Sequence, residues 1–121
     1  MRYLVPQAVI ILATLAWLGG HMTEHTYLQV LCVAHLAIPI WAAWLAPRGQ
    51  NALAILLGPG LVIGLHVLAI AFAWLQLIGS NPEDHWLGRM VLILWTLAVA
   101  AYTVYCMIAY AVVARLAQRA R

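Results

Sequence analysis

Four long apolar runs alternate with short polar segments along the chain. The runs cover residues 3–20, 27–46, 52–79 and 86–114. An α-helix needs about 20 apolar residues to cross the hydrocarbon core of a bilayer, and lipid offers the backbone no hydrogen-bond partner outside the segment. The pattern therefore predicts an all-α membrane protein with four transmembrane helices, which form a single transmembrane domain over residues 1–121.

The short polar segments favour an up-down, antiparallel four-helix bundle. The charges orient this bundle. If both chain ends are cytoplasmic, five of the six arginines share the cytoplasmic side, namely Arg2, Arg48, Arg115, Arg119 and Arg121. The acidic residues Glu24, Glu83 and Asp84 then lie outside, with Arg89 as the one outer cation. This distribution follows the positive-inside rule, so we expect an N-in, C-in topology.

Composition supports lipid as the solvent of this chain. The sequence is 67% hydrophobic and 7% charged, whereas soluble domains carry roughly 25% charged residues. The formal charge of +3 comes from arginines spread along the chain, so we expect no nucleic-acid partner. The use of arginine without lysine suggests a GC-rich genome, and hence the inner membrane of a bacterium.

Weakly polar side chains recur on one face of three of the runs. Spacings of three, four and seven residues place each set on a single helical face, which we expect to pack inward and to form hydrogen bonds between helices. The sets are Gln7, Thr14 and His21; His25, Gln29, Cys32 and His35; and Thr96, Thr103, Cys106 and Tyr110. Most tryptophans lie near the ends of the runs, where they would anchor the helices at the membrane surface.

A Gly-x-x-x-Gly motif spans Gly60 and Gly64 in the third run. Glycines four residues apart allow another helix backbone to approach closely. The motif is equally consistent with packing inside the bundle and with a contact to another chain.

Two histidines lie deep inside neighbouring runs. His35 is eight residues from Tyr27, or about 12 Å along a helix, and His66 is ten residues from Gln76, or about 15 Å. An ionisable residue inside a membrane span is costly to bury and therefore suggests a functional site. Two imidazoles facing each other at similar depth could provide the axial ligands of a b-type haem. The alternative is that each histidine forms only a structural hydrogen bond.

A second group of candidate ligands lies in the two outer segments. His21, Glu24 and His25 precede the second run, and Asp84 and His85 precede the fourth. Imidazole and carboxylate groups on the same side of the membrane could converge on a divalent metal such as zinc, copper or manganese. The alternative is a solvated, weakly acidic surface.

Nucleophilic catalysis has little support in the sequence. Ser80 has no histidine and acid arranged around it, and neither Cys32 nor Cys106 has a cationic neighbour that would favour its thiolate. We therefore do not expect the chain to be an enzyme on its own. The interpretation that fits best is a small membrane subunit that anchors or shields a partner in a larger electron-transport complex, and that either ligates a b-type haem through His35 and His66 or borders a quinone pocket. The alternative is a small oligomeric transporter or channel, with a metal cation as its cargo.

Overall fold

The computed structural model describes residues 2–46, 51–79 and 86–120, and every regular element among them is a helix. The elements, in chain order, are η1 (Arg2–Leu4), α1 (Val5–Leu18), α2 (Glu24–Leu45), α3 (Asn51–Ile55), the π-helical turn η2 (Leu56–Gly60), α4 (Leu61–Ile78) and α5 (Trp86–Ala120). Three continuous helical segments are long and apolar enough to cross a membrane, namely Glu24–Leu45, Asn51–Ile78 and Trp86–Ala120. The first apolar segment, Arg2–Leu18, is shorter.

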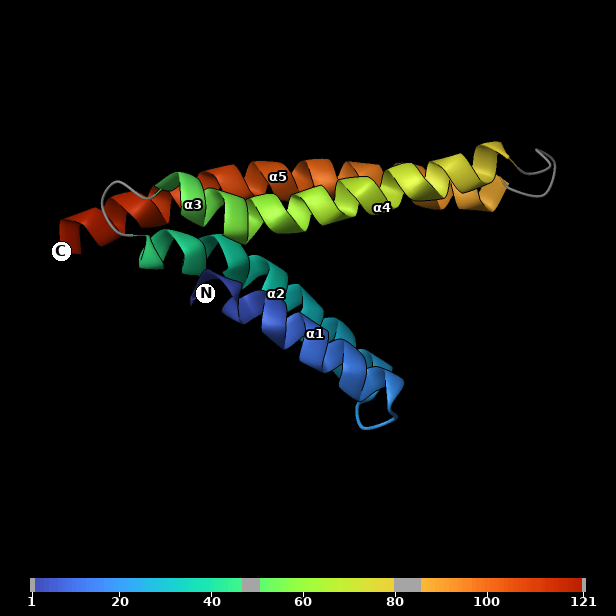
Figure 1. The fold of residues 1–121 in the computed structure, drawn as a ribbon, viewed down its shortest axis with the longest axis horizontal. Coiled ribbons are helices and arrows are strands. Elements are labelled where there is room, and N and C mark those ends of the chain that lie inside the picture. Colours follow the sequence, from blue (N-terminus) through green and yellow to red (C-terminus); the bar gives the residue numbers. More distant parts are fainter. Residues whose placement is uncertain (1, 47–50, 80–85, 121) are drawn as a thin grey trace.

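The helices form two antiparallel hairpins rather than a closed bundle. Helix α1 packs on α2, and α4 packs on α5 (Figure 1). The two hairpins meet through α2, which contacts both η2 and α5, at the end that also holds both chain termini (Figure 1). Away from that end they diverge, so the molecule has the shape of a V.

Two helix ends differ from the apolar runs. Helix α2 begins at Glu24, because the Thr23 hydroxyl accepts a hydrogen bond from the Thr26 backbone N–H at 3.3 Å and so caps the helix. The polar residues Glu24 and His25 therefore belong to the first turn of α2 rather than to a loop. Helix α5 continues beyond residue 114 to Ala120 and includes Arg115 and Arg119. Arginine favours helix, so the end of the apolar run does not end the helix.

Small side chains allow the hairpins to approach closely at the vertex. Ala42 and Ala43 of α2 and Ala54 of α3 are almost completely buried there, and Ile38 is nearly so. Tyr3, from the start of the chain, packs into the same core. The buried core is thus concentrated where the hairpins cross, and most large apolar side chains elsewhere face outward, as expected of a protein whose solvent is lipid.

The third apolar run contains a π-helical turn at its proline. Gly58 leaves the helical region with φ −89° and ψ −107°, immediately before Pro59. Gln7 of α1 reaches across to this turn, where its Nε2 donates to Leu57 O at 3.0 Å and Gly58 O at 3.4 Å. A helix break of this kind is tolerated in an apolar medium when a neighbouring helix satisfies the backbone groups, and Gln7 does so here.

The two glycines of the Gly-x-x-x-Gly motif have different roles in the structure. A Cβ atom on Gly60 would lie 2.7 Å from Ile55 O, so the π-helical turn itself requires glycine at this position. A Cβ atom on Gly64 would meet nothing within 4 Å, so Gly64 does not mediate packing inside this chain. The close helix approach involves Gly58 instead, whose added Cβ would lie 2.7 Å from the Cβ of Ala42.

We expect Gly58→Ala to destabilise the vertex by about 1–3 kcal/mol, because the new methyl group would overlap Ala42 and force two helix backbones apart. Unfolding of the purified protein in mixed micelles with an increasing fraction of SDS measures this change. Gly64→Ala, on an open face of the same helical segment, is the matched control and should lose no stability. Adding Ala42→Gly to Gly58→Ala should restore most of the loss, and a double variant as unstable as Gly58→Ala would contradict this packing.

Candidate functional site

The two half-buried histidines meet where the hairpins begin to diverge. His35 of α2 and His66 of α4 point their rings at each other, with 3.3 Å between the two Nε2 atoms and 5.5 Å between the ring centroids. The Nδ1 atom of His35 is 2.7 Å from Leu31 O, one turn earlier in α2. The Nδ1 atom of His66 is 3.3 Å from the indole Nε1 of Trp95 in α5. The sequence predicts a similar depth for these two histidines in neighbouring runs, and in the structure their rings are in contact.

The outer partners determine which ring nitrogen carries each proton. A carbonyl oxygen can only accept, so His35 donates from Nδ1 to Leu31 O and its Nε2 is an acceptor when the ring is neutral. An indole N–H can only donate, so His66 accepts at Nδ1 and carries its proton on Nε2. His66 therefore donates to His35 across the 3.3 Å contact, and every group in this chain of four is satisfied.

A proline places the His35 backbone under a second constraint. Pro39 lies inside α2 and has no N–H, so the carbonyl of His35, four residues earlier, loses its helical donor. The Tyr102 hydroxyl of α5 donates to that carbonyl at 2.6 Å. The Tyr105 hydroxyl donates to the next carbonyl, Leu36 O, also at 2.6 Å. Helix α5 thus holds the backbone of His35 while α4 holds its ring.

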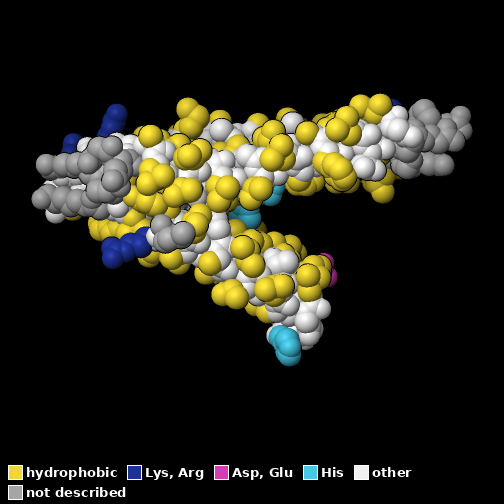
Figure 2. Space-filling view, in the orientation of Figure 1, with side chains coloured by type: hydrophobic (Ala, Val, Ile, Leu, Met, Phe, Trp, Pro, Cys, Tyr) yellow, Lys and Arg dark blue, Asp and Glu magenta, His cyan; other side chains and the backbone are white. Residues whose placement is uncertain are grey.

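The histidine pair separates two hollows between the hairpins. The larger has a volume of about 510 Å³ and lies between α1, α2 and α4, and we call it the inter-hairpin cleft. The smaller has a volume of about 330 Å³ and lies on the α5 side of the pair. Histidine side chains are visible at the floor of the opening between the hairpins in Figure 2. The pair is therefore half-buried but reachable from the apolar surroundings. Besides the two histidines, the cleft is lined by aliphatic side chains of α4, by Trp95 of α5, and by residues of the first hairpin, namely Gln7, Ile10 and Ile11 of α1 and Tyr27 and Leu31 of α2.

The pair matches only half of what bis-histidine haem ligation requires. Its rings point tip to tip, as axial ligands do, and the bond from His35 Nδ1 to a carbonyl leaves Nε2 free for a metal. The two Nε2 atoms are in direct contact at 3.3 Å, so they would have to move apart to hold a haem between them. His66 is the obstacle, because ligation through Nε2 moves its proton to Nδ1, where it would face the N–H of Trp95. Haem ligation by His35 and His66 stays a prediction.

The hydrogen-bond chain does not connect to a proton source or sink. One end is a backbone carbonyl, Leu31 O, and the other is the indole N–H of Trp95. Neither group gains or loses a proton in ordinary acid–base chemistry. In this arrangement the pair orients hydrogen-bond donors and acceptors rather than conducting protons.

The outer candidate ligands do not form a site within the part of the chain that is described. His21, Glu24 and His25 are all exposed, and the Nε2 of His25 lies 3.1 Å from the side-chain Nε2 of Gln29. Among the described residues, no group of three histidine, cysteine, aspartate or glutamate side chains is placed to hold a metal ion. Asp84 and His85 lie outside the described residues, so the metal site that includes them stays a prediction.

Only some of the side chains on the predicted polar faces form hydrogen bonds between helices. Thr96 and Thr103 donate to Leu92 O and Val99 O of their own helix, so they do not link helices as expected. Gln7 does link helices, through the π-helical turn. Thr14 donates to Ile10 O at 2.8 Å, and its contact of 2.9 Å with the Tyr27 hydroxyl joins α1 to α2.

The aromatic donors were missed by the sequence-based interpretation. Trp95, Tyr102 and Tyr105 donate the hydrogen bonds that position His66 and the backbone of α2 around His35. They belong neither to the weakly polar faces nor to the tryptophans near the ends of the runs. A signal was available, because these three lie in the middle of the fourth apolar run. A buried tyrosine or tryptophan normally has a hydrogen-bond partner, so a position in mid-span indicates a nearby carbonyl or imidazole.

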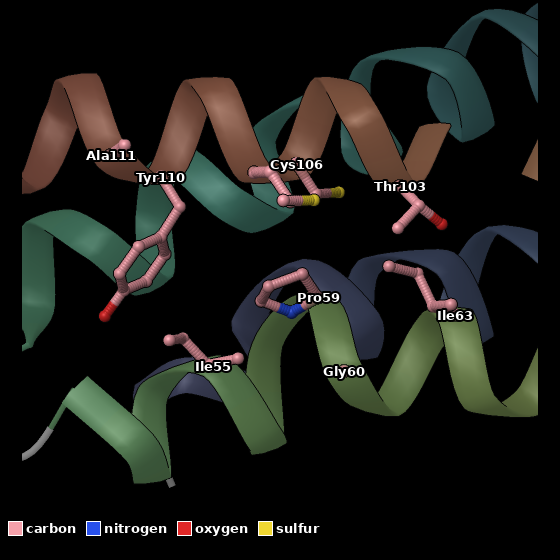
Figure 3. Close-up of a pocket in the computed structure, with 9 residues that line it drawn as sticks. Ile55, Pro59, Gly60, Ile63, Thr103, Cys106, Tyr110 and Ala111 are labelled. Atoms are coloured by element: carbon pink, nitrogen blue, oxygen red, sulfur yellow. The ribbon is translucent and has the colours of Figure 1, made fainter. Parts of the chain in front are cut away.

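Another cavity, of about 400 Å³, lies between the η2–α4 segment and α5. Figure 3 shows Pro59 and Ile63 from one side facing Thr103 and Cys106 from the other. Thr103 donates to its own helix, and the remaining lining is largely apolar. The Tyr110 hydroxyl is also engaged, with Asn51 at 3.4 Å, so the histidine pair is the stronger candidate site.

Comparison with known proteins adds nothing to the geometry of this site. The chain matches no protein-family model, no curated protein and no solved structure. The interpretation of the site therefore depends on its own geometry.

We expect Tyr102→Phe to cost about 1 kcal/mol of unfolding free energy, because it leaves His35 O without a donor in an apolar environment. In a Pro39→Ala background the cost should largely disappear, because residue 39 then supplies the helical N–H to the same carbonyl. SDS unfolding of the two single variants and the double variant measures this coupling. Tyr110→Phe serves as the control, since its long contacts to Asn51 do not involve Pro39. Equal costs of Tyr102→Phe in both backgrounds would contradict the role assigned to Pro39.

The proton positions in the pair are also testable. In protein labelled with ¹⁵N-histidine, we expect His35 to carry its proton on Nδ1 and His66 on Nε2, because Leu31 O and Trp95 permit no other neutral arrangement. The ¹⁵N chemical shifts distinguish protonated from unprotonated ring nitrogens, and the His35→Leu and His66→Leu variants assign the signals. Trp95→Phe removes the indole N–H that donates to His66 Nδ1, so the proton of neutral His66 should no longer be restricted to Nε2. The same tautomer at both histidines would show that the chain of hydrogen bonds is not formed as described.

Proposed function

We propose that this chain is a small integral membrane subunit that packs in the bilayer against a larger partner of an electron-transport complex, with His35 and His66 as its functional centre. The observation that carries the proposal is the divergence of the two hairpins. They leave an apolar cleft of about 510 Å³ with an imidazole pair at its floor. A cleft open to the bilayer is a place for a partner helix, a lipid or a lipophilic cofactor.

The outward-facing surface supports the role of a subunit. Large apolar side chains are exposed along all of the long helices, and the most completely buried residues lie at the vertex. Every regular element among the described residues is a helix, and the long ones are apolar. A chain of this kind contributes helices and a site to an assembly more readily than it performs a reaction alone.

The proposed topology has four transmembrane helices with both termini in the cytoplasm. The shorter Arg2–Leu18 segment is the fourth span, paired with α2. The distribution of arginines and acidic residues favours this orientation over the inverse one. The absence of lysine suggests a bacterial inner membrane. The start of α1, the end of α2 and the end of α5 lie toward the same end of the molecule (Figure 1), which supports this topology.

A b-type haem is the cofactor that the pair would hold in the redox form of this proposal. The tip-to-tip rings and the bond from His35 to Leu31 O favour it, and the indole N–H on His66 opposes it. A haem-binding form would require Trp95 to turn away from His66. The haem would then supply one-electron chemistry, while His35 and His66 would hold it.

The test is a mild-detergent purification of the tagged chain from its native membranes. We expect unlike chains to copurify, and a reduced-minus-oxidised absorption spectrum reports any b-type α-band. If a band is present, it should disappear in both His35→Ala and His66→Ala and persist in His25→Ala, whose side chain is exposed outside the cleft. Purification as a homo-oligomer with no unlike chain would contradict the subunit proposal and favour a transporter or channel.

A further inference from the structure

The contact between the two histidines is a polar junction that a ligand can enter. On one side is the N–H of His66, and on the other is the unprotonated Nε2 of His35. The separation of 3.3 Å lies at the long end of nitrogen hydrogen bonds, so this contact is the weakest point in the chain together with the 3.3 Å bond from Trp95. Separating the two Nε2 atoms costs little free energy if an inserted group forms a hydrogen bond with each of them.

The two ends of the chain make the junction selective. Leu31 O and Trp95 prevent the neutral rings from exchanging tautomers, so the junction always offers one donor and one acceptor. A hydroxyl group can accept from His66 and donate to His35 at the same time. A carbonyl or ether oxygen can accept from His66 only, and it would leave the nitrogen of His35 unpaired in an apolar site.

The surroundings define the rest of the ligand. The cleft has the size of a small-molecule site, and its walls on α1, α2 and α4 are largely aliphatic. Tyr27 and Trp95 line it with aromatic surface, and the smaller hollow beyond the pair also contains Trp95. A hollow on each side gives the rings room to separate. An aromatic ring with an apolar tail, entering from the bilayer, fits this combination.

We propose that the inter-hairpin cleft binds a membrane-soluble hydroquinone, or a phenol of the same shape, whose hydroxyl group inserts between His66 Nε2–H and His35 Nε2. The corresponding quinone binds more weakly, because its carbonyl oxygen leaves His35 without a donor. The inference goes beyond the role of a subunit and does not depend on it, since binding is a property of the chain alone.

The experiment compares three ligands with the same alkyl tail, namely 2-decyl-1,4-hydroquinone, its dimethyl ether and 2-decyl-1,4-benzoquinone. They are titrated anaerobically into the purified chain in lipid nanodiscs, and binding is measured by calorimetry. We expect the hydroquinone to bind roughly tenfold or more tightly than either of the other two, the difference that an unpaired buried acceptor produces. This preference should disappear in His35→Leu and in His66→Leu and persist in the control variant His25→Leu.

A second measurement on the unmodified chain keeps the inference testable if those variants fail to fold. The hydroquinone should shift the ¹⁵N signals of His35 Nε2 and His66 Nε2, while the dimethyl ether should leave them unchanged. Equal affinities for the hydroquinone and the ether, with no shift at either nitrogen, would overturn the inference, because they indicate partition into apolar surface only. A b-type haem band that depends on both histidines would also overturn it, since the haem would occupy the junction. Copurification with unlike chains is unaffected by either result, so failure here is distinguishable from failure of the subunit proposal.

Discussion

The arrangement of this chain depends on hydrogen bonds between helices at the two helix irregularities that contain proline, where a carbonyl group can be left without a helical donor. In an apolar solvent no water can satisfy such a group, so a neighbouring helix must do so or the break is not tolerated. Pro39 releases His35 O, and Tyr102 of α5 satisfies it. At the break beside Pro59, Gln7 of α1 donates to two carbonyls. These contacts are directional and specific, whereas apolar helix faces are largely interchangeable in lipid, so they determine which helices meet and where.

The histidine site is a consequence of the same constraint. His35 is the residue whose carbonyl Pro39 releases, so its backbone is held to α5 while its ring is free to reach α4. His66 completes that link, and Trp95 orients it. Hydrogen bonds of the His35, His66, Trp95 and Tyr102 side chains therefore join α2, α4 and α5 at the same position along the helices. The junction between the imidazoles lies at the edge of this network, next to the cleft, and is the point at which a ligand can enter at low cost.

Much of the fold could be predicted from the sequence. Long apolar runs predict helices of membrane length because the length of a run and the thickness of a bilayer are directly comparable. The depths of His35 and His66 could also be predicted, because the rise per residue of a helix is constant. The ends of α2 and α5 could not be predicted from hydrophobicity, because Thr23 caps one end and arginines continue the other, and neither effect requires apolar residues.

By itself, the sequence determined the helical class, the number of apolar runs and the similar depth of the two histidines, since these follow from local composition and helix geometry. Only the tertiary structure decided that the hairpins diverge instead of closing into a bundle, because that depends on where small residues permit contact. It also decided that Trp95, Tyr102 and Tyr105 complete the site. The direction of the hydrogen bonds between His35 and His66 depends on partners distant in the chain, and no local pattern specifies such partners.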